Sequence, residues 1–127
     1  MTSPDQFSLL FVDDEADFLA TIDEFFTSLG YTVHTASNGQ EALLRVKEHL
    51  PNAVFLDISM PQMDGTETLR LIHEIEPGIQ VIVASGYASE DLARSLLQHG
   101  ACDFFQKPVD LMRLHETIER LQTLQDL

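Results

Sequence analysis

The sequence has little cysteine and little positive charge. Cys102 is the only cysteine in the 127 residues, which excludes an internal disulfide and fits a reducing compartment. Seven basic residues stand against 21 acidic ones, so the formal net charge is −14. Nucleic-acid affinity depends on basic groups that neutralise phosphates, and anionic membrane surfaces repel an acidic protein. We therefore expect neither nucleic acid nor a membrane as a direct partner.

Long hydrophobic runs and phosphate-binding glycine motifs are also missing. The longest wholly apolar runs, such as Leu9–Val12, have four residues, whereas a membrane-spanning helix needs about 20. Met1–Gln6 lacks the basic and apolar regions of a secretory signal. The six glycines never form Gly-x-Gly-x-x-Gly, which argues against a dinucleotide-binding fold. We expect a cytoplasmic protein with one domain, residues 1–127 with a core of about 7–124, and no further domain in the chain.

Short apolar runs alternate with amphipathic segments along the chain. The runs are continuous, which is typical of strands buried on both faces of a parallel sheet. The strands predicted in this way are Phe7–Val12, Tyr31–Thr35, Ala53–Leu56, Ile79–Ala84 and Cys102–Phe105. Five helices are predicted between and after these strands. The first ends at Gly30, the second starts near Asn38-Gly39, and the third runs from Gly65 towards Glu76. The fourth is capped by Ser89, and the fifth starts at Asp110. The pattern predicts a (βα)₅ α/β fold with a doubly wound parallel sheet.

Polar groups follow four of the five predicted strands. Asp13 and Asp14 follow the first strand, Asp57 the third, Ser85 the fourth and Lys107 the fifth. Because ligands bind beyond the carboxyl ends of the strands in open α/β sheets, these groups would share one edge. Taken alone, the first two acids could equally cap a helix. The lysine, one of two in the chain, ends what we interpret as an inner strand and should therefore have an anionic partner.

This set of groups suits phosphoryl chemistry. Three carboxylates at one edge repel each other unless their pKa values rise or a cation lies among them. Hard oxygen ligands in small number favour Mg²⁺. A carboxylate can act as a nucleophile towards phosphorus and form an aspartyl phosphate. A metal, a lysine and a hydroxyl can then stabilise the charge on the transferred group.

Four motifs in this order resemble the receiver domain of two-component response regulators. They are Val12–Glu15, Asp57–Gly65, Val83–Gly86 and Gly100–Pro108. The most specific is the second, which reads Asp-x-x-Met-Pro-x-Met-Asp-Gly. The resemblance covers essentially the whole chain. It implies a flavodoxin-like receiver fold with five parallel strands in the order 2-1-3-4-5.

The resemblance also implies roles for single residues. Asp57 would accept a phosphoryl group from a histidine kinase or a histidine phosphotransfer protein. Magnesium would be held by Asp14 and Asp57 directly, by Asp13 through water and by Ser59 through its backbone carbonyl. Lys107 would pair with a phosphoryl oxygen, and its peptide bond to the following proline would be cis.

Signal output is expected to follow from a two-position switch. By the resemblance, Ser85 would move to hydrogen-bond the phosphoryl group, and Phe104 would turn inward. The face formed by the fourth helix, fifth strand and fifth helix would then control an unknown output protein or a covalently linked domain. Arg94, Arg113 and Asp103 on that face could support a weak dimer.

Two other functions compete with that of a phosphorylated receiver domain. The expected protein is a phosphoacceptor switch and not a metabolic enzyme. A phosphatase of the haloacid-dehalogenase type has a second acid two residues after its nucleophile, where this chain has Ser59. A pseudo-receiver, an interaction module that is never phosphorylated, remains the alternative.

We further expect Tyr87 to shield the acyl phosphate from water, Cys102 to be buried and inert, and Gly65 to permit a tight turn.

The five histidines show no ligand spacing and are not expected to bind a metal.

Overall fold

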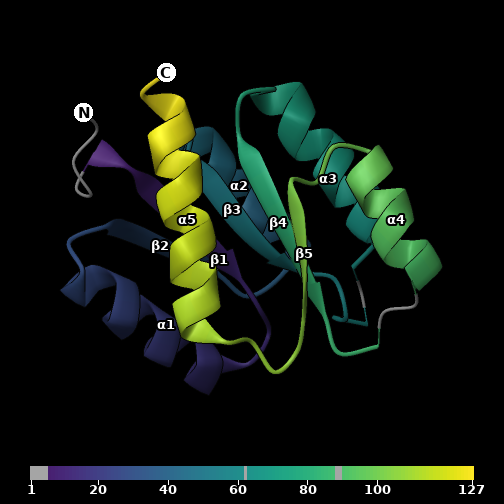
Figure 1. The fold of residues 1–127 in the computed structure, drawn as a ribbon. Helices are drawn as coiled ribbons and strands as arrows, with labels where there is room; N and C mark the ends of the chain where they lie inside the picture. The colour runs from purple at the N-terminus through teal and green to yellow at the C-terminus, as the bar shows by residue number, and fades with distance from the viewer. Residues whose placement is uncertain (1–5, 62, 88–89) are drawn as a thin grey trace.

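The computed structural model describes residues 6–61, 63–87 and 90–127, and strands alternate with helices throughout (Figure 1). The elements are β1 (Ser8–Val12), α1 (Ala16–Ser28), β2 (Thr32–Ala36), α2 (Gly39–His49), β3 (Ala53–Asp57), α3 (Gly65–Ile75), β4 (Gln80–Ser85), α4 (Glu90–Gln98), β5 (Asp103–Gln106) and α5 (Leu111–Gln125). The predicted (βα)₅ pattern is therefore confirmed.

All strands are parallel and lie in the order β2-β1-β3-β4-β5, as the resemblance implied. The register places Val12 opposite Leu56 and Asp57 opposite Ala84, so the carboxyl ends of the central strands meet at one edge. One expectation was wrong: β5 is an edge strand, so Lys107 does not follow an inner strand. A short apolar run alone does not distinguish an edge strand from a central one.

Helices cover both faces of the sheet. Figure 1 shows α5 and α1 in front of the strands, with α2, α3 and α4 on the other side. Alternate side chains of β1 serve the two layers: Leu9 and Phe11 pack with α1 and α5, whereas Leu10 and Val12 pack with the opposite helices. Strand side chains alternate in direction, which explains why the central strands are apolar at every position except their ends.

Most helix boundaries match their sequence signals. Gly30, just past α1, has a φ of 96°, a conformation that glycine adopts without steric cost. The Asn38 side chain caps α2 by accepting a hydrogen bond from the backbone N–H of Glu41. Asp110 caps α5 by accepting two such bonds. The cap expected at Ser89 lies outside the described residues.

Gly65 is required for a reason other than the expected turn. Among the described glycines, a positive φ is found at Gly30 and Gly100 and not at Gly65. A Cβ at position 65 would instead lie 2.7 Å from Cγ2 of Ile58. The glycine therefore allows the start of α3 to pack against the loop that follows Asp57.

Cys102 differs from its prediction, because the residue is exposed and lies just before β5. Partial burial of the thiol, with Asp103 beside it, nevertheless raises the pKa of Cys102 to about 11. None of the helices in the described part of the chain combines the length and the hydropathy of a membrane span.

Candidate phosphoryl-transfer site

The sheet edge brings together the polar groups that the sequence singled out. Asp13 directly follows β1, Asp57 ends β3, and Ser85 ends β4. Their exposed fractions are 0%, 2% and 3%, so all three are held away from bulk water. Lys107 follows β5, and its backbone N–H donates to the carbonyl of Ser85 at 3.0 Å. Parallel pairing thus converts four separate chain positions into one cluster.

The ammonium group of Lys107 bridges the two buried carboxylates. Its Nζ lies 2.6 Å from Oδ2 of Asp13 and 3.0 Å from Oδ2 of Asp57. A third carboxylate, that of Glu15, lies at 3.7 Å, but its side chain is 70% exposed. The peptide bond between Lys107 and Pro108 is cis, as the resemblance implied. The expected anionic partner of the lysine is therefore a pair of aspartates.

Burial and hydrogen bonding act in opposite directions on these charges. Burial raises the pKa of Asp13 above its usual value, although hydrogen bonds from Lys107 and from the Glu15 N–H oppose the shift. Burial lowers the pKa of Lys107, but the hydrogen bonds to Asp13 and Asp57 and the charges of these two residues together outweigh that effect and leave the pKa raised. The lysine is therefore charged at neutral pH and holds the carboxylates close together.

The other carboxylate oxygen of Asp57 is fixed by Ser59. Oδ1 accepts hydrogen bonds from the Ser59 backbone N–H at 2.9 Å and from its hydroxyl at 2.6 Å. The backbone N–H of Ile58 donates to the carbonyl of Ala84, which ties the same loop to β4. The Asp57 side chain thus has little rotational freedom.

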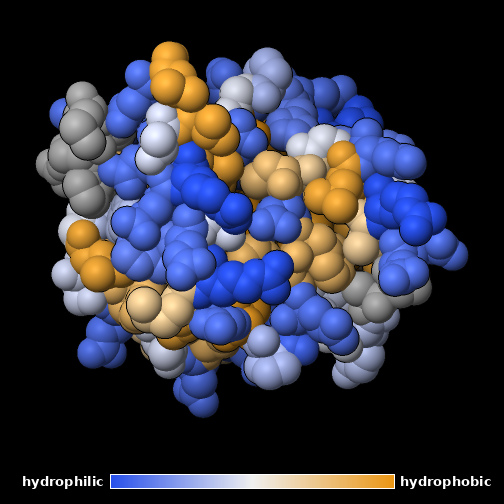
Figure 2. All heavy atoms as spheres, viewed as in Figure 1, coloured by the Kyte–Doolittle hydropathy of each residue, from blue (hydrophilic) through white to orange (hydrophobic). Residues whose placement is uncertain are grey.

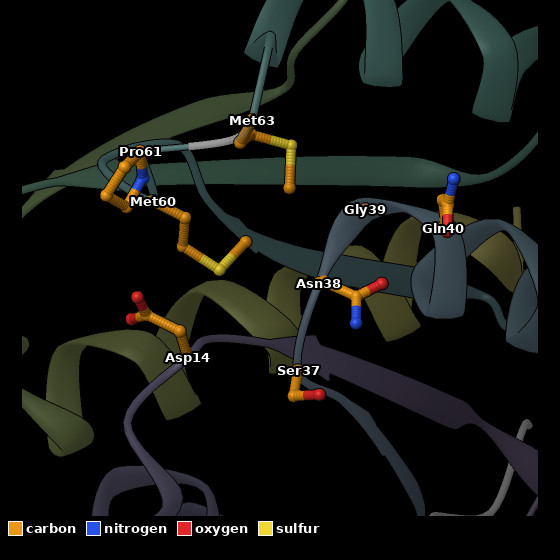
Figure 3. Close-up of a pocket in the computed structure, with 8 residues that line it drawn as sticks. All are labelled: Asp14, Ser37, Asn38, Gly39, Gln40, Met60, Pro61 and Met63. Atoms are coloured by element: carbon orange, nitrogen blue, oxygen red, sulfur yellow. The ribbon is translucent and has the colours of Figure 1, made fainter.

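Asp14 is the exposed member of the acid group and opens onto a cavity of about 570 Å³. Figure 3 shows its carboxylate at the rim, across from the methionines of the β3–α3 loop. The cavity is lined by Asp14, Ser37, Asn38, Gly39, Gln40, Met60, Pro61 and Met63. Solvent therefore reaches the Asp14 carboxylate from this side, while Asp13 and Asp57 stay buried.

A divalent cation fits the acid cluster. One carboxylate oxygen from each of Asp13, Asp14 and Asp57 lies within 4.8 Å of the others. An all-oxygen set with one member open to water is the kind that Mg²⁺ prefers, because this ion keeps several of its own waters.

The residues expected to switch are Ser85 at the end of β4 and Phe104 in β5. The Ser85 hydroxyl accepts a hydrogen bond from the Tyr87 N–H at 3.0 Å. Phe104 is half-buried and packs on the α2–α3–α4 side of the sheet, whereas Phe105 is buried on the opposite side. The Tyr87 ring is 90% exposed, so in this conformation it does not cover the carboxylates.

Sequence reasoning missed two ring contacts. The Phe18 ring lies under Lys107, with 5.1 Å between Nζ and the ring centroid. The imidazoles of His34 and His49 stack at 3.7 Å with an interplanar angle of 8°. Burial first, and then His49 and Arg45, lower the pKa of His34. Neither contact has a signal in local spacing, because each joins residues that are distant in sequence.

Curated proteins with similar sequences match most of this chain. It is 37% identical over 116 residues to the transcriptional regulatory protein ZraR of Klebsiella oxytoca, covering 91% of this chain but only 26% of that protein. It is 33% identical to the chemotaxis protein CheY of Thermotoga maritima, covering 89% of this chain and 95% of the relative. The chain thus spans about a quarter of some curated relatives and nearly the whole of others.

A solved structure of CheY from Borrelia burgdorferi, in a complex described as CheX-CheY-BeF₃-Mg²⁺, superposes with a TM-score of 0.83 at 34% identity. The alignment covers 91% of this chain and 88% of that one. The family profile described as the response regulator receiver domain matches residues 9–119. Together with the fold and the acid cluster, this match shows that the chain belongs to the response regulator receiver domain family of two-component systems.

Proposed function

We propose that the chain is a phosphorylation switch whose acceptor is Asp57. The observation that carries the proposal is the environment of this carboxylate. It is 2% exposed, lies 3.0 Å from the Lys107 ammonium and shares an oxygen cluster with Asp13 and Asp14. A buried carboxylate between a fixed cation and a candidate metal position is suited to nucleophilic attack on phosphorus.

The proposed step is a phosphoryl transfer from a phosphohistidine. A carboxylate oxygen of Asp57 attacks phosphorus, the O–P bond forms, and the P–N bond to the donor imidazole breaks. The imidazole leaves with the bonding electron pair and takes a proton from solvent. Lys107 then pairs with a phosphoryl oxygen, and a hydroxyl such as that of Ser85, which already accepts one hydrogen bond, can still donate its own proton.

The residues proposed to hold Mg²⁺ are Asp13, Asp14, Asp57 and, through its backbone carbonyl, Ser59. When bound, the ion would neutralise charge on the phosphoryl oxygens. The Mg²⁺ named for the Borrelia burgdorferi complex supports the choice of this ion, while the ligand residues rest on the acid cluster of this chain. Asp14 is suited to admit the cation because its side chain faces the open cavity (Figure 3).

Output is proposed to pass through Ser85 and Phe104 to the α4–β5–α5 face. Phe104 is half-buried, so turning inward when Ser85 moves towards the phosphoryl group would bury more of its ring. Figure 2 shows apolar patches among hydrophilic side chains on the view that contains α4, β5 and α5. Exposed apolar side chains on these helices include Leu92, Leu97, Met112 and Leu124. Such a mixed surface suits a protein partner.

The partners belong to the proposal as well. The donor would be a histidine kinase or a histidine phosphotransfer protein, and the receiver of the signal an output protein or a linked domain. The weak dimer expected on the α4–β5–α5 face stays a prediction. There, Arg94 lies 3.9 Å from Asp91, and the Arg113 guanidinium lies 4.7 Å from the centroid of the Phe105 ring.

Phosphoryl uptake from acetyl phosphate tests the proposal. Intact mass is measured with and without Mg²⁺ for the wild type, for Asp57→Asn and for Asp91→Asn, a control at an exposed aspartate of α4. We expect one phosphoryl group on the wild type and on the control, in both cases only with Mg²⁺, and none on Asp57→Asn. A folded wild type that takes up no phosphoryl group with Mg²⁺ present would instead identify a pseudo-receiver.

A further inference from the structure

An aromatic ring lies against the active-site lysine. Phe18, in the first turn of α1, is half-buried, and its ring centroid lies 5.1 Å from Nζ of Lys107. The ring is itself supported by Phe55 of β3, at a centroid distance of 6.0 Å and an interplanar angle of 34°. Phe55 precedes the Asp57 carboxylate by two positions on the same strand. Phe18 thus joins the start of α1 to the strand that carries the acceptor.

The ring contact differs in kind from the other contacts of the ammonium group. Two carboxylate oxygens accept from Nζ at 2.6 and 3.0 Å, and Glu15 lies beyond hydrogen-bonding distance at 3.7 Å. An aromatic face attracts a cation through its quadrupole, and the attraction is strongest where water is excluded. The Lys107 side chain is only 16% exposed, so this contact is largely desolvated.

Both carboxylate partners of Lys107 change during the proposed reaction. Asp57 becomes an acyl phosphate, and Asp13 contributes to the cation cluster, so neither offers the ammonium group the same partner throughout. The ring of Phe18 keeps its charge distribution at every stage. A long lysine side chain that loses its acceptors would otherwise regain rotamer freedom.

We propose that Phe18 is a positioning residue for phosphoryl transfer, because its ring holds the Lys107 ammonium group where it meets the incoming phosphoryl oxygens. The role of Phe18 in phosphoryl transfer rests on the proposed function of the chain. The contact between the ring and the ammonium group does not depend on that function.

A purely structural role would be filled by any apolar side chain of similar size. Phe18→Leu keeps an apolar side chain but removes the aromatic face, whereas Phe18→Tyr keeps both. Phe25→Leu is the matched control, since Phe25 is also half-buried on α1 but contacts Phe26 and His115.

The test combines two measurements on the whole chain. The first is the nitrogen NMR signal of the lysine ammonium groups, which is readily assigned because Lys47 and Lys107 are the only lysines. The second is the rate of phosphorylation by acetyl phosphate with Mg²⁺. For Phe18→Leu we expect the Lys107 ammonium signal to shift and to exchange faster with water, while the Lys47 signal stays unchanged. We expect phosphorylation to slow by about three- to tenfold.

The other variants decide between positioning and packing. Phe18→Tyr should stay near the wild type in both measurements, and so should Phe25→Leu. Wild-type behaviour of Phe18→Leu, or an equal loss in Phe25→Leu, would overturn the proposal. If even the wild type takes up no phosphoryl group, the proposed function fails, yet the Lys107 signal of Phe18→Leu still shows whether the ring holds the ammonium group. An unchanged signal there overturns the inference independently.

Discussion

Lys107 forms ion pairs with both buried carboxylates of the site. It lies between two carboxylates that are almost completely buried, and without it no side-chain cation of the described residues would balance the charges of Asp13 and Asp57. Removing one partner from a buried ionic group leaves an uncompensated charge, which is strongly destabilising. The raised pKa of Lys107 means that its stabilising effect is complete below its unfolded value, 10.5, and is lost as the pH rises through the higher folded value.

Cys102 supports a prediction about reactivity. The residue is exposed, but the pKa of its thiol is raised from 9.0 to about 11, so little thiolate exists at pH 8. Because the thiolate is the nucleophile, alkylation by iodoacetamide at pH 8 should be on the order of a hundredfold slower than for a free cysteine. The rate should continue to rise above pH 10. Alkylation of the folded protein at the rate of free cysteine would show that the thiol is not desolvated.

At the scale of elements, the junction between β3 and α3 depends on one close contact. A Cβ at Gly65 would lie 2.7 Å from Cγ2 and 3.0 Å from Cβ of Ile58, a β-branched side chain that adjusts poorly. Gly65→Ala should therefore lower the free energy of unfolding by about 1–3 kcal/mol in urea titrations. Gly86→Ala is the control, since nothing lies within 4 Å of a Cβ there.

A double variant tests the cause of that loss. Ile58→Ala removes the methyl group that the new Cβ would meet, so Gly65→Ala should cost less in its presence than alone. Strict additivity of the two changes would show that the glycine is needed for a different reason.

The elements were predictable to the extent that local pattern determines them. Apolar runs located the strands β1, β3 and β4, since side chains that alternate between two helical layers are apolar at every position inside the strand. The apolar run Cys102–Phe105 did not by itself place β5 at the edge, because sequence order does not fix neighbours in a sheet; only the strand order implied by the resemblance gave that position.

The acid cluster was predictable for a related reason. Parallel strands align their carboxyl ends, so residues that follow them must converge, as Asp13, Asp57 and Lys107 do. The Phe18 ring under the lysine was not predictable, because the contact depends on how α1 packs against the sheet.

At the scale of the whole molecule, the charged side chains of the site gather at one edge of the sheet, and the fold holds them there. Asp13 and Asp57 lie at the ends of the central strands β1 and β3, the Phe18 ring comes from α1, and Lys107 follows the edge strand β5. Phosphorylation would add negative charge at this edge of a chain whose formal net charge is already −14. The added charge shifts the equilibrium between two conformations of a nearby segment when one conformation interacts with that charge more favourably than the other. The neighbouring α4–β5–α5 face is where the output of that change is proposed.

The most direct test of Asp57 as the phosphoryl acceptor is to locate the phosphoryl group on the chain. Protein treated with acetyl phosphate and Mg²⁺ is reduced with borohydride, which converts an aspartyl phosphate to homoserine, and its peptides are then sequenced by mass spectrometry. We expect the reduced residue at position 57 alone. Reduction at Asp13 or Asp14 instead, or at several exposed carboxylates alike, would contradict the assignment of Asp57 as the acceptor.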